Sequence, residues 1–262
     1  MHYIDSHAHF DLCIEDGMAE RELLEGMDAA GVRAAVQVSI EPAGFAFARD
    51  FARRNRERGA YFTLGIHPST RAGGADLESL RGYALEVLSS DDAPLLFGIG
   101  EAGLDYYRMR QEKEPQMRAF EFQAALARDT GVPLVVHSRD AMDDSIELLA
   151  RIRPGAGVMH CFSGGSREAR RVMDLGFMIS FAGNLTYRAA ADLHDAARYV
   201  PLDRVLLETD APFLAPVPLR GRKNRPEHVA HTYAFFASLR GEKTETIMES
   251  VQKNFASLLR PA

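Results

Sequence analysis

The stretch Tyr3-Ile4-Asp5-Ser6-His7-Ala8-His9-Phe10 ends a short apolar run with two histidines that are two residues apart. In a β-strand, residues i and i+2 point to the same side, so the two imidazoles share one face. If this strand begins a β/α barrel, that face is the interior, and the pair can bind a metal ion at the carboxyl end of the strand. Two ordinary structural histidines would give the same pattern, so the rest of the chain has to distinguish the two interpretations.

Short apolar runs recur along the chain and alternate with helix-like segments. Their continuous apolar character is typical of parallel strands that are covered on both faces. We predict strands at Tyr3 to His7, Ala34 to Ile40, Tyr61 to Ile66, Leu95 to Ile99, Val132 to His137, Gly157 to His160, Phe177 to Phe181 and Val205 to Glu208. Helices are predicted at about 18–30, 42–58, 76–90, 112–130, 140–152, 165–175, 186–198, 226–239 and 244–259.

Eight βα units in 262 residues predict an α/β protein that forms a closed (β/α)8 TIM barrel, with one domain over residues 1–262. An open doubly wound sheet is the alternative fold. It is disfavoured because no Gly-x-Gly-x-x-Gly loop follows the first strand, and because polar residues recur at the ends of many strands instead of one switch point.

The composition excludes several classes of protein. A net charge of −6, from 37 acidic and 31 basic residues, argues against general electrostatic binding of nucleic acid but allows a local basic patch. Two cysteines do not make a disulfide framework. The sequence shows no secretory signal and no apolar run of about 18 residues. We therefore expect a soluble cytoplasmic protein that spans no membrane, and favour a monomer.

Residues that can bind metal ions follow many of the predicted strands. Five of the nine histidines lie at or just after strand ends, and two carboxylates follow the fourth and eighth strands. One strand-end histidine is commonly a hydrogen-bonded structural group, and one carboxylate is commonly a helix N-cap. Several such groups at one barrel rim would be costly to bury unpaired, whereas divalent cations satisfy them together. These residues are His7, His9, His67, Glu101, His137, His160 and Asp210.

Mixed imidazole and carboxylate donors indicate a centre of two metal ions, about 3.5–4 Å apart. We assign His7, His9 and Asp210 to one ion, and His137 and His160 to the other. Glu101 bridges the two ions in this assignment. One layer deeper, Asp5 and Glu208 are predicted either to orient an imidazole or to form a buried charge pair.

The chain resembles the TatD family of metal-dependent deoxyribonucleases, within the amidohydrolase-like barrel hydrolases. The matching motifs fall in order along nearly the whole chain: Ile4-Asp5-Ser6-His7-Ala8-His9, Gly65-Ile66-His67-Pro68, Gly100-Glu101-Ala102-Gly103-Leu104-Asp105-Tyr106-Tyr107, His137-Ser138-Arg139-Asp140-Ala141, His160-Cys161-Phe162-Ser163-Gly164, Glu208-Thr209-Asp210-Ala211-Pro212 and Arg220-Gly221-Arg222-Lys223-Asn224-Arg225-Pro226. The resemblance implies the same ligand set, with Glu101 as the bridge. It also implies metal-dependent phosphodiester hydrolysis, chiefly exonucleolytic cutting of DNA.

Two divalent ions are the expected cofactors: Mg²⁺ or Mn²⁺ in catalysis, with Zn²⁺ or Ni²⁺ as ions that the isolated protein can carry. A water activated by both ions would be the nucleophile. Glu101 would act as the bridge, and Asp210 would either orient or deprotonate that water or serve only as a ligand. We expect His67 either to donate to the phosphate or leaving oxygen, or to be a hydrogen-bonded rim histidine.

Basic residues are expected to contact the substrate. They crowd the loop after the eighth strand, from Arg220 to Arg225, and the loop after the fourth strand, at Arg108 and Arg110. Arginines bind phosphate oxygens bidentately, and tyrosines can stack on unpaired bases. Specific contacts are predicted for Arg220, Asn224 and Tyr106.

A narrow barrel mouth admits a strand end more easily than a duplex, so single-stranded or frayed 3′ ends of DNA are the expected substrate. A small-molecule hydrolase acting on lactones, amides or phosphotriesters is the alternative, and a catalytically idle metal-binding protein is the third hypothesis. By strand alternation, Cys161 is expected to point away from the face of His160 as a small buried residue. We also expect most of the four arginines of the second helix to be solvated surface groups: Arg49, Arg53, Arg54 and Arg56.

Overall fold

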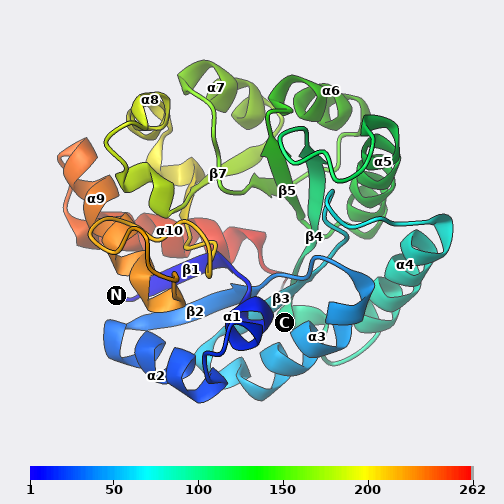
Figure 1. Ribbon diagram of the computed structural model, residues 1–262, viewed down its shortest axis with the longest axis horizontal. Helices are drawn as coiled ribbons and strands as arrows, with labels where there is room; N and C mark the ends of the chain where they lie inside the picture. The colour runs from blue at the N-terminus through cyan, green and yellow to red at the C-terminus, as the bar shows by residue number, and fades with distance from the viewer. Residues whose placement is uncertain (261–262) are drawn as a thin grey trace.

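Parallel pairing joins the eight apolar runs into one sheet, whose strand order is the order of the sequence. The computed structural model describes residues 1–260, so the last two residues of the predicted domain lie outside the described part. The sheet confirms the predicted single-domain (β/α)8 barrel (Figure 1). The strands are β1 (Tyr3–Ala8), β2 (Val32–Gln37), β3 (Ala60–Leu64), β4 (Leu96–Asp105), β5 (Leu134–Arg139), β6 (Gly157–Met159), β7 (Phe177–Phe181) and β8 (Val205–Leu207).

The barrel closes just beyond the regular ends of β1 and β8. The N–H of Asp210 donates to the carbonyl of His7 at 2.9 Å, and the N–H of His9 donates to the carbonyl of Ala211 at 2.8 Å. Ala8 and Ala211 form a parallel bridge between these two bonds. Closure therefore brings the His-x-His pair beside Asp210, although about 200 residues separate them in sequence.

Helices surround the sheet in Figure 1, and the apolar side chains between the two layers form one core. The α-helices are α1 (Phe10–Glu15), α2 (Glu20–Ala30), α3 (Phe45–Arg54), α4 (Gly74–Leu88), α5 (Lys113–Thr130), α6 (Met142–Ile152), α7 (Ser166–Asp174), α8 (Ala191–Tyr199), α9 (Val229–Arg240) and α10 (Thr244–Leu258). No helix among residues 1–260 combines the length and the apolar character needed to cross a membrane.

Two helical segments differ from the prediction. The sequence did not predict α1, which has only six residues and is stabilised from outside: the N–H groups of Phe10 and Asp11 donate to Gln37 Oε1, at 2.7 and 3.4 Å. The helix expected at 42–58 is divided into α3 and two short 3₁₀ helices. Helix α3 ends at Arg54, and the side-chain and backbone N–H groups of the following residue, Asn55, both donate to the carbonyl of Phe51.

Strand β4 continues six residues beyond its predicted end, and this extension positions Glu101. Two glycines with positive φ, Gly100 at +142° and Gly103 at +152°, allow the strand to stay against β5. A Cβ atom at Gly103 would lie 1.9 Å from the carbonyl oxygen of His137, a contact that no other residue could make. The pairing shifts register between Ile99 and Ala102, so Glu101 occupies an irregularity inside the strand.

Two of the four arginines among which most were expected to be solvated, Arg49 and Arg53, bind Asp92, and of these two Arg53 is still half exposed. Arg49 donates through Nε to Asp92 Oδ2 at 2.7 Å, and Arg53 donates to both carboxylate oxygens. Asp92 is only 7% exposed. Hydrogen bonds from Arg53 and then Arg49 outweigh burial and lower the pKa of Asp92 to about 2. The hydrogen bonds of Arg49 and Arg53 to Asp92 therefore link α3 to the segment that leads into β4.

We predict that Asp92→Asn lowers the free energy of unfolding at pH 7 by about 1–2 kcal/mol. Because the folded-state pKa of Asp92 is below its ordinary value, the stabilisation is present above pH 4 and is lost as the pH falls through 2. Urea denaturation at pH 7 and pH 3 measures the difference, which should shrink at the lower pH. The control is Asp50→Asn, because Asp50 pairs with Arg53 on the exposed surface. Equal effects of the two variants would contradict the assignment.

Candidate metal centre

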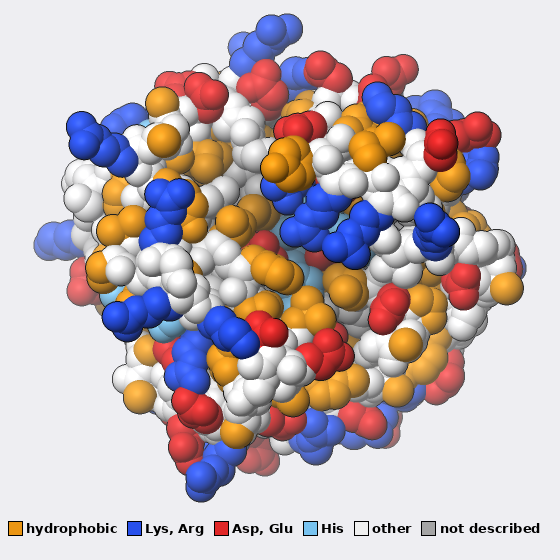
Figure 2. Space-filling model, viewed as in Figure 1, with side chains coloured by type: hydrophobic (Ala, Val, Ile, Leu, Met, Phe, Trp, Pro, Cys, Tyr) orange, Lys and Arg blue, Asp and Glu red, His pale blue; other side chains and the backbone are white. Residues whose placement is uncertain are grey.

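The predicted donors meet at the floor of a cavity at the carboxyl end of the barrel. The cavity has a volume of about 510 Å³. Six of the seven histidines and carboxylates predicted at the barrel rim line it. Figure 2 shows the hollow near the centre of this face, with histidine side chains at its floor. Lining donors are His9, His67, Glu101, His137, His160 and Asp210, and His7 lies just beneath them.

Glu101 occupies the centre of the cluster and divides its two oxygens between two sets of imidazoles. Oε1 lies 2.8 Å from His137 Nδ1 and 2.9 Å from His160 Nε2. Oε2 lies 3.4 Å from His7 Nε2 and 3.6 Å from His9 Nε2. A carboxylate that faces two donor sets in this way has the geometry expected of a bridge between two ions.

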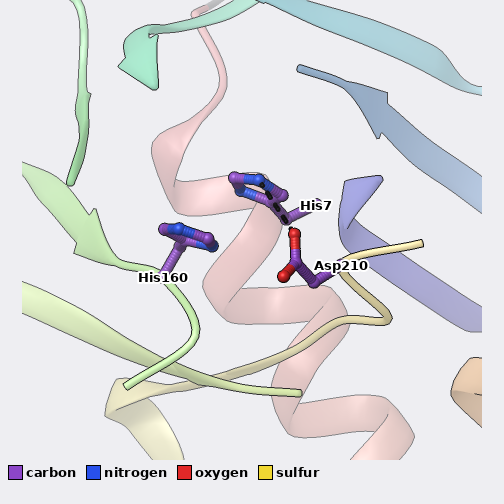
Figure 3. A group of neighbouring side chains, drawn as sticks. All are labelled: His7, His160 and Asp210. Atoms are coloured by element: carbon purple, nitrogen blue, oxygen red, sulfur yellow. Dashed lines mark ion pairs between the residues drawn. The ribbon is translucent and has the colours of Figure 1, made fainter. Parts of the chain in front are cut away.

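Asp210 closes the cluster on the side of His7 and His9. Its Oδ1 lies 3.4 Å from His9 Nε2 and 3.8 Å from His7 Nε2. Figure 3 shows His7 and Asp210 directed toward one another, with His160 beside them. The rings of His7 and His160 are stacked, with centroids 3.8 Å apart.

The described residues form three overlapping groups that can each hold a cation, because the donor atoms within a group lie within 4.8 Å of one another. Two of these groups include His7, and two include Glu101, so neighbouring ions would share ligands. The groups are His7, His160 and Asp210; His7, His9 and Glu101; and His67, Glu101 and His137. This grouping brings all six predicted ligands together, and it also adds His67, which our assignment left without an ion. The division of ligands between two ions stays a prediction.

His7 provides a test of whether metal fits. The residue is 0% exposed, and neither ring nitrogen has a hydrogen-bond partner within residues 1–260. Leaving a buried imidazole unpaired is unfavourable, whereas coordination of a cation would satisfy Nε2. The donor set around His7 is the one that divalent transition ions accept. The residues present therefore fit a bound divalent metal.

The two deeper carboxylates, for which orientation of an imidazole and a charge pair were both open, have different partners. Glu208 Oε1 lies 3.2 Å from His160 Nδ1, so it orients this ring. Asp5 instead accepts the N–H and hydroxyl of Thr209, at 2.9 and 2.6 Å. Burial raises the pKa of Asp5 to about 8. Asp5 thus fixes the segment that leads to Asp210, and no imidazole depends on it.

The charges of the cluster support each other. Burial opposes ionisation of Glu101, but the surrounding imidazoles, His160 foremost, hold its pKa well below the ordinary value. Burial likewise opposes protonation of His160, yet Glu101 and Glu208 raise the pKa of this imidazole well above its ordinary value. Glu101 is therefore an ionised carboxylate, which is the form that a bridging ligand requires.

None of the three predicted substrate contacts lines this cavity. Asn224 is 0% exposed and donates to the carbonyls of Thr209 and Phe213, so a substrate contact does not fit its burial and it holds the loop instead. The Tyr106 hydroxyl donates to Asp144 Oδ2 at 2.7 Å, beside a second hollow. Arg220 is exposed and lies over the ring of Tyr187, with its Cζ 4.5 Å from the centroid.

Other residues line the cavity that the sequence-based reasoning did not assign to the site. Arg139 is one of them, and its place in the His137-Ser138-Arg139 motif was an available signal. Phe213 is another, and no local pattern marked it. The expectation that Cys161 points away from the cavity is wrong, because β6 ends at Met159 and strand alternation no longer applies. Burial raises the pKa of the Cys161 thiol well above its ordinary value, which keeps it protonated.

The chain is similar to known proteins along nearly its whole length. Residues 4–260 match the family model described as TatD related DNase. YcfH of Escherichia coli K12, an uncharacterized metal-dependent hydrolase, is 36% identical over 262 residues, covering 98% of this chain and 96% of the relative. The crystal structure of YjjV, a TatD homolog of E. coli K12, is similar with a TM-score of 0.89 and 29% identity over 99% of this chain and 98% of that chain. A variant of the organophosphorus hydrolase of Deinococcus radiodurans shares the fold, with a TM-score of 0.65 and 17% identity over 99% and 91% of the two chains.

We predict that the wild-type protein binds two divalent ions and that Glu101→Ala binds neither tightly, because Glu101 faces both donor sets. His9→Ala should lose one ion and retain the other. Metal content after dialysis against Mn²⁺, measured by plasma mass spectrometry, gives the stoichiometry. His231→Ala is the control, because His231 is exposed on α9. Retention of two ions by Glu101→Ala would rule out the bridging assignment.

Proposed function

The chain belongs to the TatD-related DNase family of metal-dependent hydrolases, and on that basis we propose that it hydrolyses phosphodiester bonds of DNA and removes nucleotides from single-stranded or frayed 3′ ends. One observation carries the proposal: the carboxylate of Glu101 lies between two sets of imidazoles at the floor of an open cavity. When bound there, two divalent cations supply a nucleophilic water at neutral pH and neutralise charge on the phosphoryl oxygens.

Asp210 is placed to handle the proton of the attacking water. Its side chain is 13% exposed and lines the cavity, so water can reach it. Its backbone is held by the bond to the His7 carbonyl, which fixes the carboxylate relative to the cluster. A group in this position can accept a proton in the transition state, and it can also serve as a ligand.

His67 is better suited to donate a hydrogen bond than to bind metal. The backbone N–H of Ser69 donates to His67 Nδ1 at 3.0 Å, so the proton of the neutral ring is on Nε2. Burial lowers the pKa of His67 to about 3, which keeps the ring neutral at pH 7. Because Nε2 is directed to Glu101, at 3.4 Å from Oε1, His67 can present its N–H to a phosphoryl or leaving oxygen beside the bridge.

A second candidate function is hydrolysis of small neutral esters such as lactones or phosphotriesters at the same cluster. The observation that favours it is the apolar part of the cavity, formed by Leu12, Ile40 and Phe213. This surface accepts an uncharged ester as readily as the flat face of a nucleobase. The cluster itself is compatible with both substrates, so only an assay of both classes separates them.

We predict that the protein degrades 5′-labelled single-stranded DNA with Mg²⁺ or Mn²⁺ into progressively shorter products, and that EDTA abolishes the activity. A blunt duplex should be degraded at least about tenfold more slowly, because the cavity admits a single strand more easily. A panel of lactones and phosphotriesters is assayed in parallel with the same protein. Turnover of a lactone without degradation of DNA under any divalent ion would overturn the nuclease proposal.

We predict that Asp210→Asn lowers kcat by about 10²-fold or more, since it removes both proton acceptance and negative charge. The metal content of the variant, measured on the same sample, distinguishes the two roles of Asp210. Two retained ions with reduced kcat indicate a general base, whereas loss of one ion indicates a ligand. Asp195→Asn on α8 is the control, because Asp195 lies outside the cavity lining. Wild-type kcat in Asp210→Asn would exclude both roles.

A further inference from the structure

The cavity above the metal cluster has two chemically different walls. Arg108 and Arg139 line one wall and come from the ends of β4 and β5. Leu12, Ile40 and Phe213 line the other and follow β1, β2 and β8. Strands β4 and β5 lie across the barrel from β1 and β8, so the walls face one another. In Figure 2, basic side chains border one side of the central hollow and apolar side chains border the other.

Neither arginine of the basic wall has an internal anion as a partner. Within residues 1–260, no ion pair joins Arg108 or Arg139 to a carboxylate. Other basic residues that sequence favoured for phosphate binding do have partners: Arg225 pairs with Glu22 and Glu227, and Lys223 pairs with Asp16. Arg220 and Arg222 of that loop also have no carboxylate partner within residues 1–260, but neither lines the cavity. Arg108 and Arg139 are therefore the guanidinium groups that the cavity itself offers to an external anion.

Arg139 is held in place by its neighbours. Its Cζ lies 4.0 Å from the centroid of the Tyr107 ring, a cation–π contact that holds the guanidinium group over the ring. Its carbonyl accepts the N–H of Tyr106 at 2.9 Å, and its backbone lies opposite that of Asp105 in the parallel register of β4 and β5. A guanidinium that is already oriented loses less conformational entropy when it binds an oxyanion.

Asp105 connects this wall to the metal cluster. Its Oδ1 accepts the N–H groups of Tyr107 and Arg108, at 3.0 and 2.7 Å. Its Oδ2 lies 3.7 Å from His137 Nε2, on the side of the imidazole away from Glu101. Asp105 thus holds the backbone of Tyr107 and of the cavity residue Arg108, and it also faces the predicted ligand His137. The fold therefore sets the position of Arg108 relative to the metal cluster.

We propose that Arg139, stacked on Tyr107, and Arg108 bind a phosphate group of the substrate, while Phe213 on the facing wall contacts the attached nucleobase. The inference rests on the proposed function and names its substrate class as a nucleotide phosphate ester carrying a planar base. Of the two loops in which the sequence predicted phosphate contacts, it favours the one after β4, at Arg108, and it adds Arg139 at the end of β5. A bound neutral ester would leave both guanidinium groups without an anionic partner.

The test is equilibrium binding of thymidine 5′-monophosphate and of inorganic phosphate to the metal-loaded protein, by calorimetry at several NaCl concentrations. Arg139→Gln should weaken binding of both probes by about tenfold. The slope of log affinity against log salt concentration should also fall by about one, because one contact between a cation and the phosphate is lost. Phe213→Ala should weaken only the nucleotide, by a factor of about five. Arg110→Gln is the matched control, because Arg110 is exposed in the same loop and does not line the cavity.

Wild-type affinity for both probes in Arg139→Gln and Arg108→Gln would overturn the inference. If Arg139→Gln fails to fold, Tyr107→Leu carries the test, since Tyr107 is 64% exposed and its loss removes the stacking platform. That variant should bind the nucleotide about threefold more weakly. Binding of the nucleotide through Arg139 without any cleavage of DNA would refute the proposed function, but it would support phosphate binding by the basic wall.

Discussion

Glu101 presents one carboxylate oxygen to His137 and His160 and the other to His7 and His9. A buried carboxylate in such a position must be compensated, because isolated charge in a protein interior is strongly unfavourable. The imidazoles stabilise the negative charge of Glu101, and Glu101 in turn favours the protonated form of His160. Divalent ions would balance the negative charge of the carboxylates and coordinate the imidazoles at the same time. Five histidines that lie at or shortly after the ends of β1, β3, β5 and β6 place a ring nitrogen beside this carboxylate.

Several features of the fold are explained by the need to place Glu101 there. Gly100 and Gly103 let β4 continue past its expected end, so that Glu101 comes from within a strand and not from a mobile loop. The bonds between the ends of β1 and β8 bring His7 and His9 to the same side as Asp210. Buried carboxylates then fix the supporting backbone and rings. The predicted ligands consequently lie within strands or shortly after strand ends, where side chains are positioned more precisely than in long loops.

Substrate recognition is less centralised than the metal cluster. The loop of Arg220 to Arg225 contributes to the fold, because Lys223 and Arg225 pair with acidic residues and Arg220 stacks on Tyr187. The cavity itself combines guanidinium groups with an apolar wall. A charged ester with an attached flat group is complementary to that combination, and this complementarity connects the family membership to the specific chemistry of this chain.

The periodic apolar runs and the polar residues at their ends were sufficient to predict the barrel, because parallel strands must be apolar on both faces and because barrel geometry brings all strand ends together. The six predicted ligands follow from the same rule, and the structure brings all six to one place. Contacts between residues far apart in the sequence were not predictable. Gln37 stabilises a helix of six residues, and the side chain of Asn224 donates its hydrogen bonds to backbone carbonyls. The guanidinium group of Arg139 is positioned by the ring of Tyr107. The local sequence pattern predicts which face of a strand or helix a side chain occupies. Whether its polar atoms find a hydrogen-bond partner within the protein depends on packing between segments that are far apart in the chain.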